Sequence, residues 1–232
     1  MNKIAIFYHC LFHQDTPDNP LPAAVNIVRE QMDMAKASGL LNVAIEFHAG
    51  VNGGDESLAT ASLLLPHNAQ IVMHGLQCKN ECRTIRMLEG WLPGHEDWYV
   101  LYFHSKGATH PHGDGFTGTW RRCMMRHCVT NWRNCVAALD EWCDVAGVHY
   151  MEPPATPPGQ RIMAGNFWWS KASYLMTLPS IMDRDRIKLS GIDSLESRYE
   201  SEVWIGNGPI QPKVCDFHGP DWNPSKMASC TA

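Results

Sequence analysis

The stretch LYFHSKGATH, residues 101–110, decides how the rest of the chain is interpreted. Its first half is aromatic and aliphatic and predicts a buried β-strand. Its second half turns polar at His104-Ser105-Lys106-Gly107. In an open α/β sheet, ligands bind beyond the carboxyl ends of the strands. We therefore expect the chemistry of this protein at the end of this strand, where a histidine and a lysine bring positive charge.

Strand-like and helix-like runs alternate on both sides of this stretch. The strand-like runs are residues 3–10, 42–50, 69–75, 98–107 and 144–151, and the helix-like runs include 23–39, 55–65, 80–91 and 118–143. Such alternation is typical of β-α-β units and a mostly parallel sheet. With no repeat or linker in 232 residues, we predict an α/β fold: a single Rossmann-like domain, residues 1–232, with a mostly parallel central sheet flanked by helices.

Five of the predicted strands carry a histidine at or near the carboxyl end. These residues are His9, His48, His74, His104 and His149. A histidine is also an ordinary polar residue with which to end a strand, so one case would mean nothing. Five in the same register indicate a shared polar rim along one edge of the sheet.

Composition narrows the class of protein. Hydrophobic content of 44% and charged content of 19% are those of a globular protein. A net charge of −5 gives no general reason to expect nucleic-acid binding, which rewards a basic face. No apolar run reaches about 18 residues, so we expect no membrane span. The amino-terminal apolar run reads as a first strand rather than a signal peptide.

The chain has nine cysteines, an odd number, and no Cys-x-x-Cys pair. Cys78 and Cys82 lie four residues apart and could supply half of a metal site on one helix face. We instead expect reduced thiols that pack as small hydrophobic side chains.

Four segments resemble those of a little-characterised group of bacterial and viral glycosyltransferase-like proteins with a GT-A-type fold. They are His104-Ser105-Lys106-Gly107, the Trp120-Arg121 pair that opens the next helix, Gly165-Asn166-Phe167-Trp168-Trp169, and SEVWIGN (201–207). The resemblance covers roughly residues 98–207. It implies transfer of a sugar from a nucleotide-sugar donor to a glycan or another hydroxyl acceptor, a modified DNA base included. The location expected for such an enzyme is the cytoplasm, or the host cytoplasm for a viral protein.

In this layout residues 1–110 form the nucleotide-binding half, and residues 111–232 form the acceptor half and a tail. GT-A enzymes usually hold a divalent cation with Asp-x-Asp at the position where this chain has His104 and Lys106. We therefore expect lysine and arginine to stabilise the departing diphosphate. The expected catalytic residues are Glu202 as base, Lys106 and His104. The expected donor-binding residues are Tyr8, His9, His48, Arg83, Ser105, Arg122 and Arg126, and the expected acceptor-binding residues are Asn166, Trp168 and Trp169.

Two further questions stay open in the sequence. Mn²⁺ or Mg²⁺ could still take part, with Asp216 and His218 as candidate ligands, or the segment around them could simply fold over the donor site. The reaction is expected to invert the anomeric centre. The alternatives are a histidine-rich metal-dependent hydrolase or phosphoesterase, in which Glu46 would supply a carboxylate, and a non-catalytic carbohydrate-binding protein.

Overall fold

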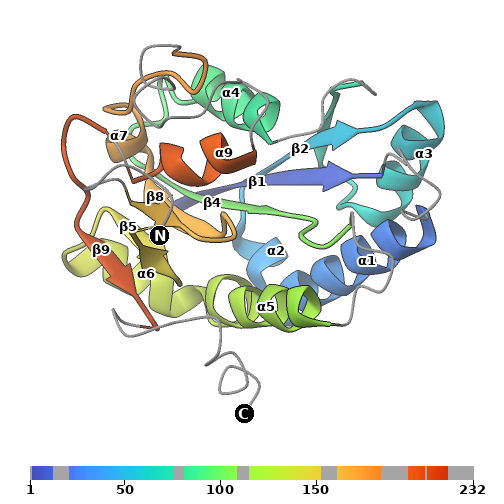
Figure 1. Cartoon of the computed structure of the whole chain (residues 1–232), viewed down its shortest axis with the longest axis horizontal. Coiled ribbons are helices and arrows are strands. Elements are labelled where there is room, and N and C mark those ends of the chain that lie inside the picture. The colour runs from blue at the N-terminus through green and yellow to red at the C-terminus, as the bar shows by residue number, and fades with distance from the viewer. Residues whose placement is uncertain are drawn as a thin grey trace.

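Seven strands of the described residues form one sheet, in the order β3-β2-β1-β4-β8-β5-β9 (Figure 1). The structure is a computed structural model that describes residues 2–12, 21–75, 81–108, 115–152, 161–183, 198–206 and 208–218, with the backbone alone for 21 and 198–200. The strands are β1 (Lys3–Leu11), β2 (Glu46–Asn52), β3 (Gln70–Met73), β4 (Trp98–His104), β5 (Val145–Gly147), β8 (Trp168–Lys171) and β9 (Val214–Asp216). A separate antiparallel pair joins β6 (Tyr150–Met151) to β7 (Ile162–Met163).

Among the described strands of the main sheet, β8 runs against the other six. β1 pairs in parallel with β2 and β4, β2 with β3, and β5 with β9, whereas β8 is antiparallel to both β4 and β5. The carboxyl ends of the parallel strands therefore lie along one edge of the sheet. The predicted α/β fold, a mostly parallel central sheet flanked by helices, is confirmed.

Helices cover both faces of this sheet (Figure 1). One face carries α4 (Cys82–Trp91), α7 (Ala172–Leu175) and α9 (Arg198–Trp204). The other face carries α1 (Leu21–Ala37), α2 (Leu40–Val43), α5 (Phe116–Met125), a turn of π-helix η1 (Arg126–Thr130), and α6 (Trp132–Glu141). The remaining helix named here, α3 (Asp55–Leu64), follows β2.

Two hydrophobic cores result, because successive side chains of a strand point to opposite faces. Along β1, Ile6 and Tyr8 pack with α1 and α5, whereas Ala5 and Phe7 pack with α4 and α9. Burial on both faces explains why this strand reads as a continuous apolar run rather than an alternating one.

The structure differs from two of the predicted elements. The run 118–143 is not one helix: the amide of Asn131 bonds to the carbonyl of Arg126, five residues back, and this wider turn ends η1 before α6 begins. The predicted strand 42–50 begins at Glu46, because residues 40–43 form α2. None of the described helices is long and apolar enough to cross a membrane.

Candidate functional site

The carboxyl edge of the sheet collects four of the five histidines expected there. His9 lies directly opposite His104 on neighbouring strands, and His74 follows β3. His149 follows β5 and has a positive φ of 69°. His48 does not belong to this edge: it is the third residue of β2 and is bonded to Glu46 at 2.7 Å. The expected donor role of His48 is therefore not supported by its position.

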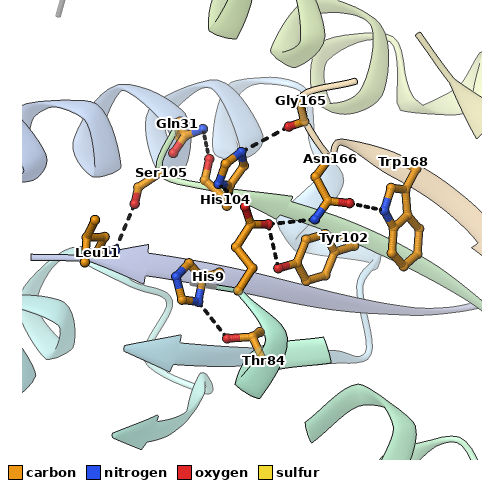
Figure 2. Close-up of polar contacts among 11 residues, drawn as sticks. His9, Leu11, Gln31, Thr84, Tyr102, His104, Ser105, Gly165, Asn166 and Trp168 are labelled. Carbon is orange, nitrogen blue, oxygen red and sulfur yellow. Dashed lines mark hydrogen bonds and ion pairs between the residues drawn. The ribbon is translucent and has the colours of Figure 1, made fainter. Parts of the chain in front are cut away.

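A buried carboxylate that no sequence motif marks organises this edge. Glu81, just before α4, is 7% exposed. Its Oε2 accepts hydrogen bonds from the Tyr102 hydroxyl at 2.9 Å and the Asn166 amide at 2.7 Å, and its Oε1 lies 3.0 Å from Nδ1 of His104. The side-chain oxygen of Asn166 accepts in turn from the indole of Trp168 (Figure 2). We call these five side chains the Glu81 network.

Both ring nitrogens of His104 lie next to hydrogen-bond acceptors. Nε2 lies 3.0 Å from the carbonyl of Gly165 (Figure 2), and Nδ1 lies 3.0 Å from a carboxylate oxygen of Glu81. A carbonyl and an ionised carboxylate can only accept hydrogen bonds, so His104 donates to both when each ring nitrogen carries a proton. Burial alone would raise the pKa of Glu81, but the charge and hydrogen bond of His104, helped by His9 and Tyr102, lower it to about 2. The result is a buried ion pair.

His9 and His74 are held neutral beside this pair. Both rings meet the Thr84 hydroxyl, His9 through Nδ1 at 2.8 Å and His74 through Nε2 at 3.0 Å. Burial lowers the pKa of His9 to about 3, against the opposing effect of Glu81. Burial, followed by the charge of Arg83, lowers the pKa of His74 to about 4. Arg83 itself is exposed and donates to the carbonyl of His74 at 3.1 Å.

Contacts with β1 and α5 fix the loop after β4. The Ser105 hydroxyl accepts from the amide of Leu11 at 2.9 Å, which ties the ends of β1 and β4 together (Figure 2). Gly107 has a φ of 93°, which favours glycine, and an added Cβ would lie 3.0 Å from a guanidinium nitrogen of Arg121. The side chain of Lys106, 9% exposed, lies with its ammonium 3.9 Å from the ring centre of Trp120. This cation–π contact orients the lysine.

The three arginines of α5 and η1 have different surroundings. Arg121, buried at 2% exposure, donates to the carbonyl of Lys106 at 3.0 Å and pairs with Glu30 at 2.8 Å. It therefore supports the loop. Arg122 is half-buried, with Nη1 3.9 Å from the same Glu30, and Arg126 is exposed on η1. These two remain the candidates for a ligand that approaches from solvent.

The expected acceptor residues lie in the interior. Trp168 and Trp169 are both 0% exposed, on opposite faces of the sheet, and the indole of Trp169 donates to the carbonyl of Cys128 at 2.7 Å. Asn166 is also 0% exposed and serves the Glu81 network from a left-handed conformation, φ 54°. Neither indole presents a face on which a sugar ring could stack. The burial of these three residues therefore does not support the expected contact with an acceptor.

Tyr8 is likewise part of the core. Its ring is 0% exposed, and its hydroxyl donates to Gln31 at 2.6 Å. Gln31 in turn donates to the carbonyl of His104 at 2.9 Å (Figure 2). Tyr8 therefore braces the end of β4 from within, and the expected contact with a donor does not fit its position.

A second polar group lies at the same edge, around α5 and the end of β9. Ligand atoms of Cys123, His127 and His218 all lie within 4.8 Å of one another, and Sγ of Cys123 is 3.3 Å from Nε2 of His218. The Trp120 indole donates to Nδ1 of His149 at 2.9 Å, and His149 Nε2 lies 4.0 Å from the same Sγ. We call Cys123, His127 and His218 the thiol–imidazole cluster. Sequence reasoning missed two of its members, although Cys123 and His127 have one-turn spacing.

Among the residues that the structure describes, those at this edge do not fit a hard divalent cation. The oxygens of Asp216 accept from the backbone amides of His149 at 3.1 Å, Tyr150 at 2.9 Å and His218 at 3.0 Å. Both carboxylate oxygens of Glu81 already contact side chains of the Glu81 network, and β4 ends without a carboxylate. Mn²⁺ and Mg²⁺ prefer oxygen ligands. The position of Asp216 therefore supports a structural role rather than the expected role as a ligand for such an ion. Its carboxylate links the segment after β5 to the segment after β9.

The expected base lies on α9, beside the segment that carries Gly165. Glu202 is 7% exposed, and its neighbour Val203 packs on Ala164. The side chain of Glu200, a second carboxylate on α9, lies outside the described residues, as do Cys78 and residues 219–224 of the tail.

A family model matches residues 7–228 and describes a domain of unknown function, DUF8361. The chain belongs to this family. Among curated proteins no match is found.

Three similar solved structures illustrate the range of likeness. One is a protein from Desulfovibrio desulfuricans G20 described as a nucleotide-diphospho-sugar transferase. It shares 13% identity over 96% of this chain and 82% of that one, with a TM-score of 0.45. A 4-diphosphocytidyl-2C-methyl-D-erythritol synthase shares 8% identity over 99% and 97%, TM-score 0.46. Glucosyl-3-phosphoglycerate synthase from Mycobacterium tuberculosis shares 13% over 82% and 67%, TM-score 0.40. Likeness of this extent says nothing about activity.

Proposed function

We propose that this protein is a nucleotide-sugar-dependent glycosyltransferase in which Lys106, rather than a metal ion, stabilises the diphosphate. The observation that carries the proposal is the basic end of β4: a lysine oriented by Trp120 follows His104 there, where a metal-dependent enzyme would have carboxylates. The motif resemblance over residues 98–207 supports the same reading.

The proposed step needs charge stabilisation and one proton transfer. As the bond between the anomeric carbon and the diphosphate oxygen breaks, negative charge builds on the leaving group, and the Lys106 ammonium stabilises it. The acceptor oxygen bonds to the anomeric carbon from the opposite side and passes its proton to Glu202, which inverts the centre. His104 acts as a positioning residue through Gly165 and Glu81, while Arg83, Arg122 and Arg126 are available to the donor from solvent.

Two observations favour the transferase over the two alternatives. Trp168 and Trp169, the tryptophans expected to bind carbohydrate, are buried, which disfavours a carbohydrate-binding protein that uses them. A histidine–carboxylate hydrolase needed Glu46 at the rim, but Glu46 begins β2 and lies at the opposite end of that strand. The proposed acceptor is a sugar or another hydroxyl compound.

A thermal-shift screen of nucleoside diphosphates and their sugars, run in EDTA and again with Mn²⁺, tests the proposal. At about 100 times its dissociation constant, a ligand adds about 2.7 kcal/mol to the free energy of unfolding. We expect one diphosphate to raise the melting temperature in EDTA, and Lys106→Met to weaken its binding at least about tenfold. Exposed Lys36 on α1 provides the matched control, Lys36→Met. Unchanged binding in Lys106→Met, or no shift with any diphosphate, would contradict the proposal.

A further inference from the structure

The thiol–imidazole cluster is built from three separate parts of the fold. Cys123 lies on α5, His127 one turn later on η1, and His218 just after β9. Cys123 is buried at 1% exposure, and the two histidines are half-buried. Side chains four residues apart on a helix lie on the same side, so Cys123 and His127 face His218 together.

The distances within the cluster suit one small ion. With Zn–S of about 2.3 Å and Zn–N of about 2.0 Å, a tetrahedral site separates sulfur from nitrogen by about 3.5 Å. Cys123 Sγ and His218 Nε2 are 3.3 Å apart, and all three ligand atoms fit within 4.8 Å. The rings of His127 and His218 lie at 77° to one another, so they approach the common centre from different directions.

His149 takes a different role from the other two histidines. Its Nδ1 accepts from the Trp120 indole, so the proton of the neutral ring is on Nε2, which points at the Cys123 sulfur from 4.0 Å. An N–H group cannot ligate a cation, but it can donate to a thiolate. His149 thereby belongs to the surroundings that orient the ligands.

The segment that carries His218 is also held in place. Asp216 accepts from the amide of His218 and from that of His149 through the same oxygen, Oδ1, at 3.0 and 3.1 Å. One carboxylate thus aligns the residue that donates to the sulfur and the residue that would bind the ion. Such positioning around the ligands is a property of built metal sites.

We propose that Cys123, His127 and His218 form a Zn²⁺ site. A thiolate with two imidazoles is a soft to borderline ligand set that suits Zn²⁺ and disfavours Mg²⁺, Ca²⁺ and Mn²⁺. Binding replaces the thiol proton of Cys123, which is released to solvent, and leaves the fourth tetrahedral position to water or another ligand. The site joins β9 to α5 and η1. It does not rest on the proposed function, because the diphosphate is assigned to Lys106.

Metal analysis of the untagged full chain tests the site directly. We expect about one zinc per chain, and in the metal-stripped protein reloaded with Co²⁺ a thiolate-to-cobalt charge-transfer band. Cys123→Ser abolishes that band, and His218→Gln lowers Zn²⁺ affinity at least about a hundredfold, beyond the roughly 10–100-fold typical of surrounding groups. Because Cys123 is buried and its variant can lose stability, the less buried His218 keeps the test decisive.

Matched controls separate this site from other effects. Cys215→Ser changes a neighbouring thiol on β9, and His67→Gln changes an exposed histidine; both are expected to keep zinc and the cobalt band. Lys106→Met is also expected to keep zinc, so failure of the proposed function leaves this result unchanged. A protein without zinc that gives no thiolate–cobalt band, or an unaltered band in Cys123→Ser, would overturn the proposal.

Discussion

The Glu81 network and the thiol–imidazole cluster lie at the same edge of the sheet, but α4 and α5 bring them in from opposite faces (Figure 1). Both are built around histidines. In the first, the two nitrogens of His104 each have an acceptor, and Glu81 has donors on both oxygens. In the second, sulfur and nitrogen atoms converge on one point. Whether a histidine is structural or binds a ligand therefore depends on the groups that surround it, not on its position on a strand.

The largest effect should come from removing the charge of Glu81. Glu81→Gln removes the carboxylate from the largely buried pair with His104, and breaking a buried pair in this way costs about 3–5 kcal/mol of unfolding free energy. Urea denaturation measures the change. Glu141→Gln, at an exposed site on α6, should cost less than about 0.5 kcal/mol.

The stability of Glu81→Gln can be set against that of a variant of the thiol–imidazole cluster. Metal-free Cys123→Ser should lose less stability than Glu81→Gln, because the cluster binds an ion and contributes little to the stability of the metal-free fold. Equal losses of stability in the two variants would show that both groups are structural, and would contradict the assignment of ion binding to the cluster alone.

A smaller effect is expected at Asn166. Asn166→Ala removes the partner of the Trp168 indole and one donor to Glu81, and an unsatisfied buried group costs about 1–3 kcal/mol. Alanine also pays about 1 kcal/mol or more for the left-handed backbone, which glycine adopts readily. In chemical denaturation we expect Asn166→Gly to be about 1 kcal/mol more stable than Asn166→Ala. A reversed order would mean that the backbone of Asn166 is not left-handed in solution.

The smallest effect concerns acid stability. The folded-state pKa values of His74 and His9, about 4 and about 3, lie below the ordinary 6.5. The unfolded chain therefore binds more protons as the pH falls below 6.5, and stability declines at up to about 1.4 kcal/mol per pH unit for each histidine. Arg83, His9 and Thr84 surround His74. The charge of Arg83 disfavours a protonated His74, and neither Thr84 nor His9 supplies a negative charge to stabilise one.

Replacing His74 isolates its share of this decline. In His74→Gln, urea denaturation at pH 7, 6 and 5 should show a slope flatter by about 1 kcal/mol per pH unit. His67→Gln, at an exposed site on the other side of β3, should leave the slope unchanged. A further loss is expected between about pH 4.5 and 2 in both proteins, where Glu81 becomes protonated and its stabilising pair is lost.

Local sequence patterns were enough to predict the architecture and part of the site. Alternating apolar runs predicted the strands that became β1, β3 and β4, and the polar ending of β4 predicted an edge with His9, His104 and Lys106. The break at η1 was not predicted, because residues 119–143 contain neither proline nor glycine. A widened turn also leaves the spacing of the hydrophobic residues almost unchanged.

What the sequence determined by itself was therefore the α/β fold and the edge of the sheet at which polar groups collect, because strand and helix periodicities are local. Which of those polar groups have their hydrogen-bonding atoms occupied by neighbours depends on the tertiary structure. Glu81 meets Asn166 across 85 positions, and Cys123 meets His218 across 95. The same packing removed Trp168, Trp169 and Tyr8 from the surface, because both faces of this sheet are covered by helices. Burial and convergence are properties of contacts between distant segments, and no local pattern contains them.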